Sequence, residues 1–463
     1  MPEIKTDLSS NIFRAYDIRG IVDQELSVDA VYTIGIALGN KAWEQQHTQF
    51  IIGRDGRLSG PALSAALTEG LRAAGCSVID LGMVPTPLLY FATHFLKTGT
   101  GVMITGSHNP TQYNGLKMLI AGDILHTTSI TELYQRISQN KLITREYGDY
   151  KTRDITADYL HAVLSRVKLA RSFKIVADCG NGVTGQLAPL LLKKLGNEVI
   201  PLFCEIDGHF PNHHPDPMVP KNLKTLIETV KKEKADLGLA FDGDGDRLGV
   251  VTEHGDIIWP DRQLMLFAQD VLQRFPGATI VYDVKCTRLL KTLIEQNGGK
   301  PLMSATGHSL IKAAVKRVQA PLAGEMSGHI FFSDNWYGFD DALYCAARLL
   351  ELLAKQNLTI GQLFDQFPKT VSTPELPITV TEEEKFTLIK KLQHQAHFPT
   401  AEIITIDGIC ANYPHGWGLI RASNTTPTLV TRFEADTPEN LAWIQQQFKQ
   451  QLLTLAPHLK LPF

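Results

Sequence analysis

The clearest pattern along the chain is a short apolar run that ends at a glycine or an aspartate and leads into a helical pattern. Three stretches have this form: FIIGRDGRLSG (50–60), FKIVADCGNGVTG (173–185) and ATIVYDVKCTRLL (278–290). Short apolar runs bounded by turn residues are typical of buried strands. The chain is therefore predicted to contain three strand-to-helix units of the same kind.

Each of these units continues with the same two further elements. A second strand follows a glycine, in GCSVIDLG (75–82), GNEVIPLF (196–203) and GGKPLMSATG (298–307). A third strand then ends in a polar loop, in VMITGSHNP, LGLAFDGDGD and PLAGEMSGH. The order strand, helix, strand, helix, strand is a βαβαβ unit, whose strands pair in parallel through right-handed crossovers. Three copies predict three similar α/β domains.

Polar and proline-rich segments divide the chain between these units. The segment 138–156 is charged, 254–262 holds a glycine and a proline, and 366–379, with three prolines, is predicted to be a linker. We predict domains at 1–152, 153–255, 256–367 and 368–463. The fold class is α/β: three similar α/β domains with mixed, mostly parallel sheets and a C-terminal α+β domain around a central cleft.

Composition and charge limit the classes of function. The 463 residues are 44% hydrophobic and 20% charged, which is ordinary for a large globular protein. A formal net charge of −3 gives no reason to expect nucleic acid or an anionic membrane as a partner. Six scattered cysteines without metal-ligand spacing indicate a reducing compartment. With no visible signal peptide and no apolar run near the ~18 residues of a membrane helix, we expect a cytoplasmic protein.

Three aspartates alternate with glycine in FDGDGDRLGV, between two apolar runs. Asp242, Asp244 and Asp246 would repel one another in a tight loop unless a cation lies among them. A hard divalent ion, Mg²⁺ or Mn²⁺, suits such carboxylates. An EF-hand is excluded because its sixth position holds Arg247 instead of glycine and strand-like runs flank the loop. A purely structural Asp/Gly turn is the alternative, and we favour the metal site.

The loop in GVMITGSHNPTQYNGLK (101–117) carries Ser107, an exposed-looking nucleophile with no evident hydrolase partner. The G-x-S-x-G elbow is absent, and no Ser/His/Asp order stands out. Ligands bind beyond the carboxyl ends of parallel strands, which places Ser107 at a corner equivalent to that of the aspartate loop. A metal held by three carboxylates has coordination positions left for a phosphate oxygen. This suggests that Ser107 carries a phosphate.

The third polar loop, GEMSGH, places Glu325, Ser327 and His329 at alternate positions. In an extended segment all three project from the same face, where a carboxylate and a hydroxyl can bind vicinal hydroxyls of a sugar. A capping or turn motif is the competing interpretation. The position at an equivalent strand end favours the sugar site.

A fourth polar loop, RASNTTP (421–427), follows an apolar run in the last domain. Arg421 with small hydroxyl and amide residues fits a phosphate site, although an ordinary N-cap and turn has a similar composition. Three more candidates follow strand-like runs and rank second, because a lone Lys or His is more often structural: Lys117, Lys285 and His308. The histidines of DGHFPNHHPDP lie in a proline-dense segment and receive no function.

Together, the four loops resemble those of the α-D-phosphohexomutase superfamily, and within it the bacterial phosphomannomutase/phosphoglucomutase group. TGSHNP looks like the phosphoserine loop, DGDGDR like the metal loop, GEMSGH like the sugar-binding loop and RASNTTP like the phosphate-binding loop. The four occur in the family order across essentially the whole chain. The resemblance implies three α/β domains followed by one further domain, in agreement with the repeat.

The resemblance also implies roles for individual residues. Ser107 matches the phosphorylated serine and a metal ligand beside Asp242, Asp244 and Asp246, and Glu325 with Ser327 matches the residues that bind ring hydroxyls. The residues that match the holders of the non-reacting phosphate are Arg421, Ser423, Asn424 and Thr425. Further residues similar to those of the family's cleft are Arg247, Lys285, His308, His329, Lys117, Tyr16 and Arg19. Of these, Arg247, Lys117, His308 and His329 are candidates for catalysis.

The implied activity is reversible transfer of a phosphoryl group between C1 and C6 of mannose or glucose phosphates, with Mg²⁺ and glucose 1,6-bisphosphate as activator and intermediate. The expected partners are hexose phosphates, and the expected state is a monomer. Met326 stands where phosphoglucosamine mutases usually carry glutamine, so that activity is the alternative, ahead of a sugar phosphatase or a non-catalytic sugar-phosphate sensor. The sequence does not choose the general base among Lys117, His308 and His329.

Overall fold

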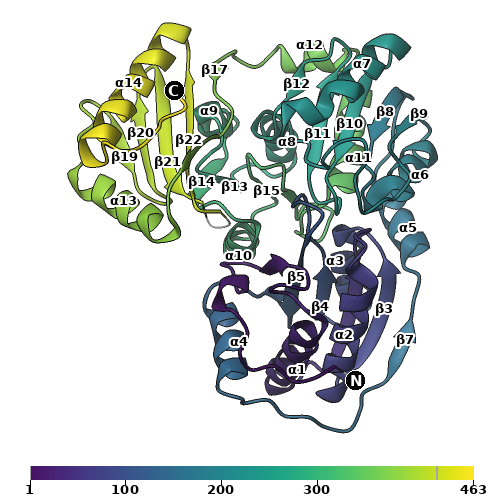
Figure 1. The fold of residues 1–463 in the computed structure, drawn as a ribbon. Helices are drawn as coiled ribbons and strands as arrows, with labels where there is room; N and C mark the ends of the chain where they lie inside the picture. Colours follow the sequence, from purple (N-terminus) through teal and green to yellow (C-terminus); the bar gives the residue numbers. More distant parts are fainter. Residues whose placement is uncertain (1, 424–425) are drawn as a thin grey trace.

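The three predicted βαβαβ units are confirmed in the computed structural model, which describes residues 2–423 and 426–463 (Figure 1). In each unit the three strands pair in parallel, with the first strand in the middle, and an antiparallel strand is added beside the third. The strands that end in the polar loops are almost wholly buried, because both faces of a parallel sheet are covered by helices.

The first domain has the strand order β1-β5-β4-β2-β3-β7, with β6 beside β5. Its strands are β1 (Ile18–Ile21), β2 (Gln49–Arg54), β3 (Ser77–Met83), β4 (Gly101–Ile104), β5 (Tyr113–Ile120), β6 (Asp123–Ile124) and β7 (Tyr150–Thr152). Its helices are α1 (Val28–Glu44), α2 (Gly60–Ala73), α3 (Thr86–Phe95) and α4 (Thr128–Ser138), preceded by a 3₁₀ turn at Ser10–Ile12.

The second domain has the order β12-β11-β10-β8-β9. Its elements are α5 (Thr156–Arg166), β8 (Lys174–Asp178), α6 (Leu187–Lys194), β9 (Glu198–Leu202), α7 (Lys224–Glu233), β10 (Leu237–Phe241), β11 (Leu248–Thr252) and β12 (Ile257–Ile258), with 3₁₀ turns at Val183–Gly185 and Pro220–Leu223. Because β12 pairs with β11, this sheet continues past residue 255.

The third domain has the order β14-β13-β15-β16. Its elements are α8 (Pro260–Arg274), β13 (Thr279–Asp283), α9 (Arg288–Gln296), β14 (Lys300–Ser304), α10 (His308–Val318), β15 (Leu322–Gly324), β16 (Ile330–Phe332), α11 (Ala342–Ala354) and α12 (Ile360–Phe364). In Figure 1 this domain lies between the second and the fourth.

The fourth domain is an antiparallel sheet with the order β17-β22-β21-β20-β19 and β18 beside β22. Its elements are β17 (Val371–Ser372), β18 (Leu376–Thr379), α13 (Glu382–Gln395), β19 (Glu402–Ile404), β20 (Ile409–Tyr413), β21 (Gly416–Ala422), β22 (Thr428–Ala435) and α14 (Pro438–Leu455). The prediction of a linker over 366–379 is therefore wrong from residue 371 on, because both β17 and β18 pair with β22.

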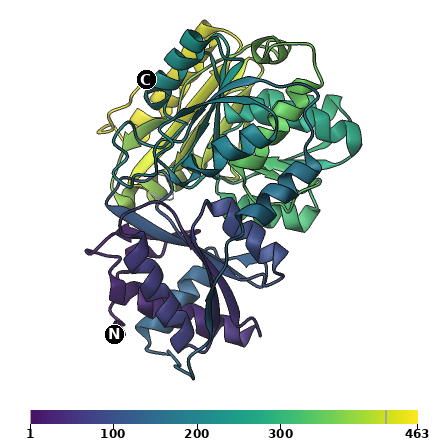
Figure 2. The same ribbon diagram turned by 90° about the vertical axis from the view of Figure 1, so that its right-hand side faces the viewer.

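The cores show how firmly the domains are joined. One continuous apolar cluster spans the second and third domains and includes α3 of the first. The fourth domain has its own core, and a small cluster of Val284, Cys410, Trp417 and Leu419 joins it to the third. Figure 2, turned from Figure 1, again shows the first domain below the rest of the molecule. No helix of the described residues is long and apolar enough to cross a membrane.

A buried carboxylate links the second and third domains. Asp341 accepts hydrogen bonds from the Tyr159 hydroxyl at 2.8 and 2.9 Å and caps α11 through the Tyr344 amide. Burial raises the pKa of Asp341 to about 7, although these hydrogen bonds oppose the shift. The folded protein therefore retains this proton at pH values where the unfolded chain has released it.

We expect Asp341→Asn to reduce the pH dependence of stability. Because the folded pKa is raised, the wild type should lose stability as pH rises from about 4 to about 7, by roughly 1–4 kcal/mol at 1.36 kcal/mol per pKa unit. The amide cannot titrate, so the variant should lose less over that range. Thermal unfolding followed between pH 4.5 and 7.5 measures the difference. Parallel pH profiles for the two proteins would contradict the expectation.

Candidate active site

All four domains contribute to a cavity of about 190 Å³ at the centre of the molecule. It is lined by Tyr16, Arg19, Ser107, His108, Lys117, Arg247, Lys285, Thr306, Gly307, His308, Glu325, Ser327, His329, Glu375, Arg421, Ser423 and Val430. The sequence singled out most of these side chains from separate loops. The fold brings them together because the loops after β4, β10 and β15 occupy equivalent corners of their sheets.

Ser107 lies in a tightly held loop directly after β4. Its φ of +49° is in the left-handed region, which is uncommon for a residue with a side chain. Its amide donates to Thr105 Oγ1 at 2.8 Å, and Thr105 in turn donates to Asp55. The Ser107 hydroxyl donates to Asp242 Oδ2 at 3.1 Å and lies 3.0 Å from His108 Nδ1. A serine at the cavity thus contacts the aspartate loop of another domain.

The buried guanidinium of Arg57 supports this loop. Arg57 donates to the carbonyl groups of Pro110, Tyr113, Ser107 and Asn109, at 2.5 to 3.0 Å. Gly106 is required here, because a Cβ at that position would lie 2.3 Å from the guanidinium. The loop backbone is therefore shaped by Arg57 and not by regular secondary structure.

Asp242, Asp244 and Asp246 lie close together beside Ser107. One oxygen of each lies within 4.8 Å of those of the others, and all three residues are buried. Asp242 Oδ1 accepts from three backbone amides of its own loop. Asp244 Oδ1 and Asp246 Oδ1 are buried and have no hydrogen-bond partner among the described residues. Oxygens in such a set are suitable ligands for a hard divalent cation.

Lys117 supplies positive charge to this cluster from the first domain. Its Nζ donates to Asp244 Oδ2 at 2.7 Å and to Asp246 Oδ2 at 2.5 Å. Burial alone would lower the pKa of Lys117, but these two carboxylates hold it well above its ordinary value. Burial, followed by Asp246 and Asp244, raises the pKa of Asp242 well above its ordinary value. The carboxylates therefore repel one another, and a cation among them would stabilise their charged forms.

The structure corrects one detail about Lys117. It was expected to follow a strand-like run, but it lies within β5, paired with Met103 of β4. Its side chain reaches the aspartates because β5 runs antiparallel to β4 and returns along the loop that carries Ser107.

The loop predicted to bind sugar, GEMSGH, is a turn, so the expected extended segment is wrong. Glu325 and His329 face each other at the ends of the hairpin between β15 and β16, where the Glu325 amide donates to the His329 carbonyl at 2.8 Å. Gly328, with φ of +100°, allows the chain to reverse there. Glu325, Ser327 and His329 nevertheless all line the cavity. Burial raises the pKa of Glu325.

The fourth domain brings Arg421 and Ser423 to the cavity. Arg421 is the penultimate residue of β21 and donates through Nε to Asp407 at 2.8 Å. Asn424 and Thr425 lie outside the described residues. Lys285 Nζ forms an ion pair with Glu375 at 2.6 Å, which joins the third and fourth domains. The cavity therefore gathers cations near the predicted phosphate site.

The N-terminal candidates and the histidines complete the cavity. Arg19, on β1, donates to Asn109 at 2.8 Å and pairs with Asp17. Tyr16 packs edge-on against His308, which begins α10. Burial holds the pKa of His308 well below its ordinary value, so that this ring is neutral. Arg247 donates through Nε to His329 Nε2 at 3.0 Å.

Several residues at or near the cavity were missed from the sequence. His108 lines it, and its position in the Ser107 motif was a usable signal. Glu375 also lines it, but it falls in the proline-rich segment that was predicted to be a linker. Arg57, Lys312 and Asp340 act through contacts distant in sequence, which no local pattern indicates. His214 contacts the carbonyl of His108, although the sequence gave its cluster no function.

Comparison with known proteins identifies the family. The models of the four phosphoglucomutase/phosphomannomutase domains, I, II, III and the C-terminal domain, match residues 10–143, 157–255, 259–371 and 375–451. The chain belongs to the phosphoglucomutase/phosphomannomutase family. A phosphomannomutase/phosphoglucomutase of Pseudomonas putida is 55% identical over 98% of both chains. A phosphoglucomutase of Neisseria meningitidis is 52% identical over 96% of this chain and 97% of that protein.

A solved structure shows the same agreement in three dimensions. A phosphoglucomutase/phosphomannomutase family protein from Burkholderia thailandensis has a TM-score of 0.93 and 49% identity, covering 98% of this chain and 100% of that one. Membership of the phosphoglucomutase/phosphomannomutase family makes the chain a mutase, which transfers a phosphoryl group within its substrate. The predicted superfamily is thereby confirmed.

We expect a divalent cation to stabilise the folded protein through the aspartate cluster. At a hundredfold excess over its Kd, one bound ion contributes about 2.7 kcal/mol. Thermal unfolding with and without Mg²⁺ or Mn²⁺ should show a higher midpoint for the wild type and none of this gain for Asp244→Asn. Asp178→Asn, which changes a buried carboxylate at the end of β8, is the matched control and should keep the gain. An equal gain in Asp244→Asn would exclude this site.

Proposed function

We propose that the chain interconverts the 1-phosphates and 6-phosphates of glucose and mannose through phospho-Ser107 and a hexose 1,6-bisphosphate. The observation that carries this proposal is the contact of the Ser107 hydroxyl with Asp242, at the wall of a cavity to which all four domains contribute. A phosphoryl group on that oxygen would lie between the carboxylate cluster and the sugar site.

Mg²⁺ is the proposed ion. Asp242, Asp244 and Asp246 would hold it, with an oxygen of phospho-Ser107 as a further ligand. The Oδ1 atoms of Asp244 and Asp246, which accept no hydrogen bond from the described residues, fit that role. When bound, the ion supplies charge stabilisation to the phosphoryl group in transfer. Lys117 and Arg247 surround the same position and stabilise that charge as well.

The transfer itself needs little covalent chemistry from the protein. A free hydroxyl of the hexose monophosphate attacks the phosphorus, the bond to Ser107 Oγ breaks, and the hydroxyl proton passes to a basic side chain. The resulting bisphosphate turns end for end, and its other phosphoryl group returns to Ser107. We assign the base to His329, whose Nε2 accepts a hydrogen bond from Arg247 Nε and so has no proton; this hydrogen bond must open before Nε2 takes the proton of the substrate hydroxyl.

Substrate binding is assigned to the opposite side of the cavity. Glu325 and Ser327 bind ring hydroxyls, and Arg421, Ser423 and Lys285 bind the phosphate that does not react. Tyr16 and Arg19 close the cavity from the first domain. The assignment extends to Asn424 and Thr425 through the sequence motif alone.

The size of the cavity bears on how the intermediate turns. About 190 Å³ is less than the ~300 Å³ of a small ligand pocket, so a hexose bisphosphate needs more room to reorient. The fourth domain has its own core and a small apolar contact with the third. We propose that it moves about residues 366–372 during each turnover.

Ser107→Ala should abolish conversion of glucose 1-phosphate to glucose 6-phosphate, because no oxygen remains to carry the phosphoryl group. A coupled assay with glucose 1,6-bisphosphate measures this, and mass spectrometry detects the phosphoserine in the wild type. Ser138→Ala, at an exposed position that ends α4, is the matched control and should retain activity. Turnover by Ser107→Ala at the wild-type rate would refute the mechanism, and net release of phosphate without isomerisation would indicate a phosphatase.

Mannose 1-phosphate and glucose 1-phosphate should both be converted, and glucosamine 1-phosphate more slowly. Met326 underlies this expectation, because it is buried in the sugar-binding turn and offers no amide to an amino sugar. Initial rates with the three sugars at equal concentration provide the measurement. A preference for glucosamine 1-phosphate would instead support the phosphoglucosamine mutase alternative.

A further inference from the structure

Asp340 is a buried carboxylate that none of the roles above uses. It lies in the segment between β16 and α11 and is fully inaccessible to solvent. Its backbone bridges to Phe331 on β16, which fixes its side chain beside the sugar-binding turn. A charged group in such a position is costly unless it is closely paired.

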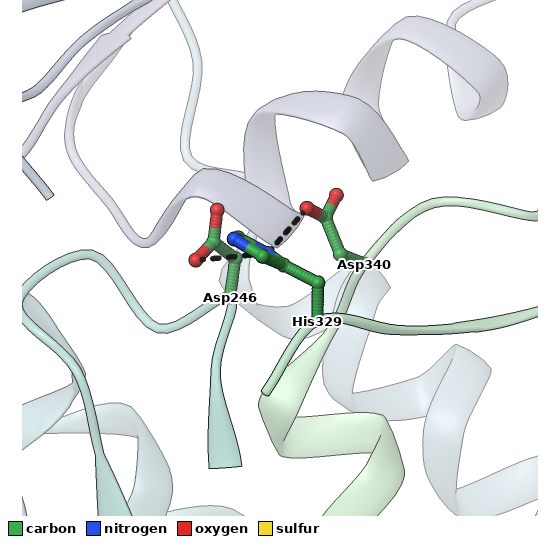
Figure 3. A group of neighbouring side chains, drawn as sticks. All are labelled: Asp246, His329 and Asp340. Carbon is green, nitrogen blue, oxygen red and sulfur yellow. Dashed lines mark ion pairs between the residues drawn. The ribbon is translucent and has the colours of Figure 1, made fainter. Parts of the chain in front are cut away.

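Two side chains pair with Asp340. Its Oδ2 lies 2.9 Å from His329 Nδ1, and its Oδ1 lies 2.6 Å from Lys312 Nζ. Figure 3 shows the His329 ring between Asp340 and Asp246, whose Oδ1 is 3.5 Å from the same nitrogen. Lys312 comes from α10 and also packs over the Tyr90 ring, at 4.2 Å from its centroid.

The two nitrogens of His329 have different partners. Nδ1 faces carboxylate oxygens, which cannot donate a hydrogen bond, so a proton belongs on that nitrogen. Nε2 accepts from Arg247 Nε at 3.0 Å, so this nitrogen carries no proton. Both contacts indicate the same tautomer.

We propose that Asp340, oriented by Lys312, is the positioning residue that keeps the proton of His329 on Nδ1 and presents Nε2 to the substrate as the proton acceptor. The inference rests on the proposed function, because it gives His329 the part of the base. Asp340 does not touch the reacting atoms and acts through the imidazole.

Lys312 helps to keep the Asp340 carboxyl in its charged form. Burial by itself would raise the pKa of this carboxyl, but Lys312 and His329 outweigh burial and hold the pKa well below its ordinary value. The lysine also fixes which oxygen faces the histidine, because its ammonium can only donate.

A second cation is the competing explanation. Ligand atoms of Asp246, His329 and Asp340 lie within 4.8 Å of one another, as in a metal site. Asp246, however, already belongs to the proposed ion site of the aspartate loop, and Asp340 has Lys312 at 2.6 Å. The charge of Asp340 is thus compensated by a side chain of its own domain, which favours positioning over a second metal ion.

Asp340→Asn tests the proposal directly. Lys312 would hold the amide oxygen, so the amide nitrogen would face His329 Nδ1 and donate to it. The ring would then accept at Nδ1 and carry its proton on Nε2, in place of the hydrogen bond from Arg247, and there it cannot act as a base. Removal of the lysine in Asp340→Asn/Lys312→Met leaves the amide free to rotate, and the original tautomer should return in part.

The tautomer is read by NMR of the full-length protein labelled with ¹⁵N-histidine. The His329 signals are assigned by their loss in His329→Gln, and the spectra are recorded where the ring is neutral. We expect a protonated Nδ1 in the wild type and a protonated Nε2 in Asp340→Asn. A wild-type ring protonated on Nε2, or a tautomer that Asp340→Asn does not change, would overturn the proposal whatever the activity.

Kinetics provide the second readout. A misplaced base should lower kcat for glucose 1-phosphate about 10²-fold and leave KM within about threefold, since general-base catalysis contributes 10²–10⁴. Asp334→Asn, which removes a carboxylate from a buried ion pair with Arg348 in the same domain, is the control and should keep its kcat. A changed tautomer with unchanged kcat would overturn the catalytic role of this positioning.

Two further results separate this inference from its alternatives. Metal analysis that finds two divalent ions per chain in the wild type and one in Asp340→Asn would make Asp340 a ligand and overturn the positioning role. If the wild type does not isomerise hexose phosphates, the proposed function fails, and the NMR result still states where the proton of His329 lies.

Discussion

Buried negative charge is the constraint on which the rest of this structure depends. Three aspartates lie together after β10, and the lysine that pairs with two of them comes from another domain. Lys117 reaches them because β5 returns beside the loop of Ser107. The ion pairs therefore hold the first and second domains in one arrangement. Within that arrangement, Ser107 meets Asp242 and the cavity forms.

The repeat of strands and the polar loops at their ends could be predicted from the sequence because each is a local pattern. Apolar runs followed by glycine specified the βαβαβ units, and the loops after β4, β10 and β15 followed from the rule for ligand sites in such sheets. These parts of the site need no knowledge of distant contacts. The domain limits and the roles of individual residues remain predictions.

Other parts depend on contacts that only the folded chain creates. Arg57 binds carbonyl groups about 50 residues away, and Lys312 with Asp340 forms a pair behind His329, so neither belongs to a motif. An extended segment was predicted where the structure has a turn at Gly328, because alternation of residue types alone does not distinguish a hairpin turn from a strand. Proline in 371–379 suggested a linker, yet strands at the edge of a sheet tolerate it.

The closeness of the first two domains has a mechanical consequence. A Cβ on Gly243 would lie 2.3 Å from the carbonyl oxygen of Ser107, so the aspartate loop and the serine loop touch through their backbones. Such packing leaves no room for sliding between them. In the proposed mechanism the reaction centre is therefore the rigid part of the enzyme, and the sugar and the fourth domain are the parts that move. Each turnover would present the other end of the substrate to a centre that does not move.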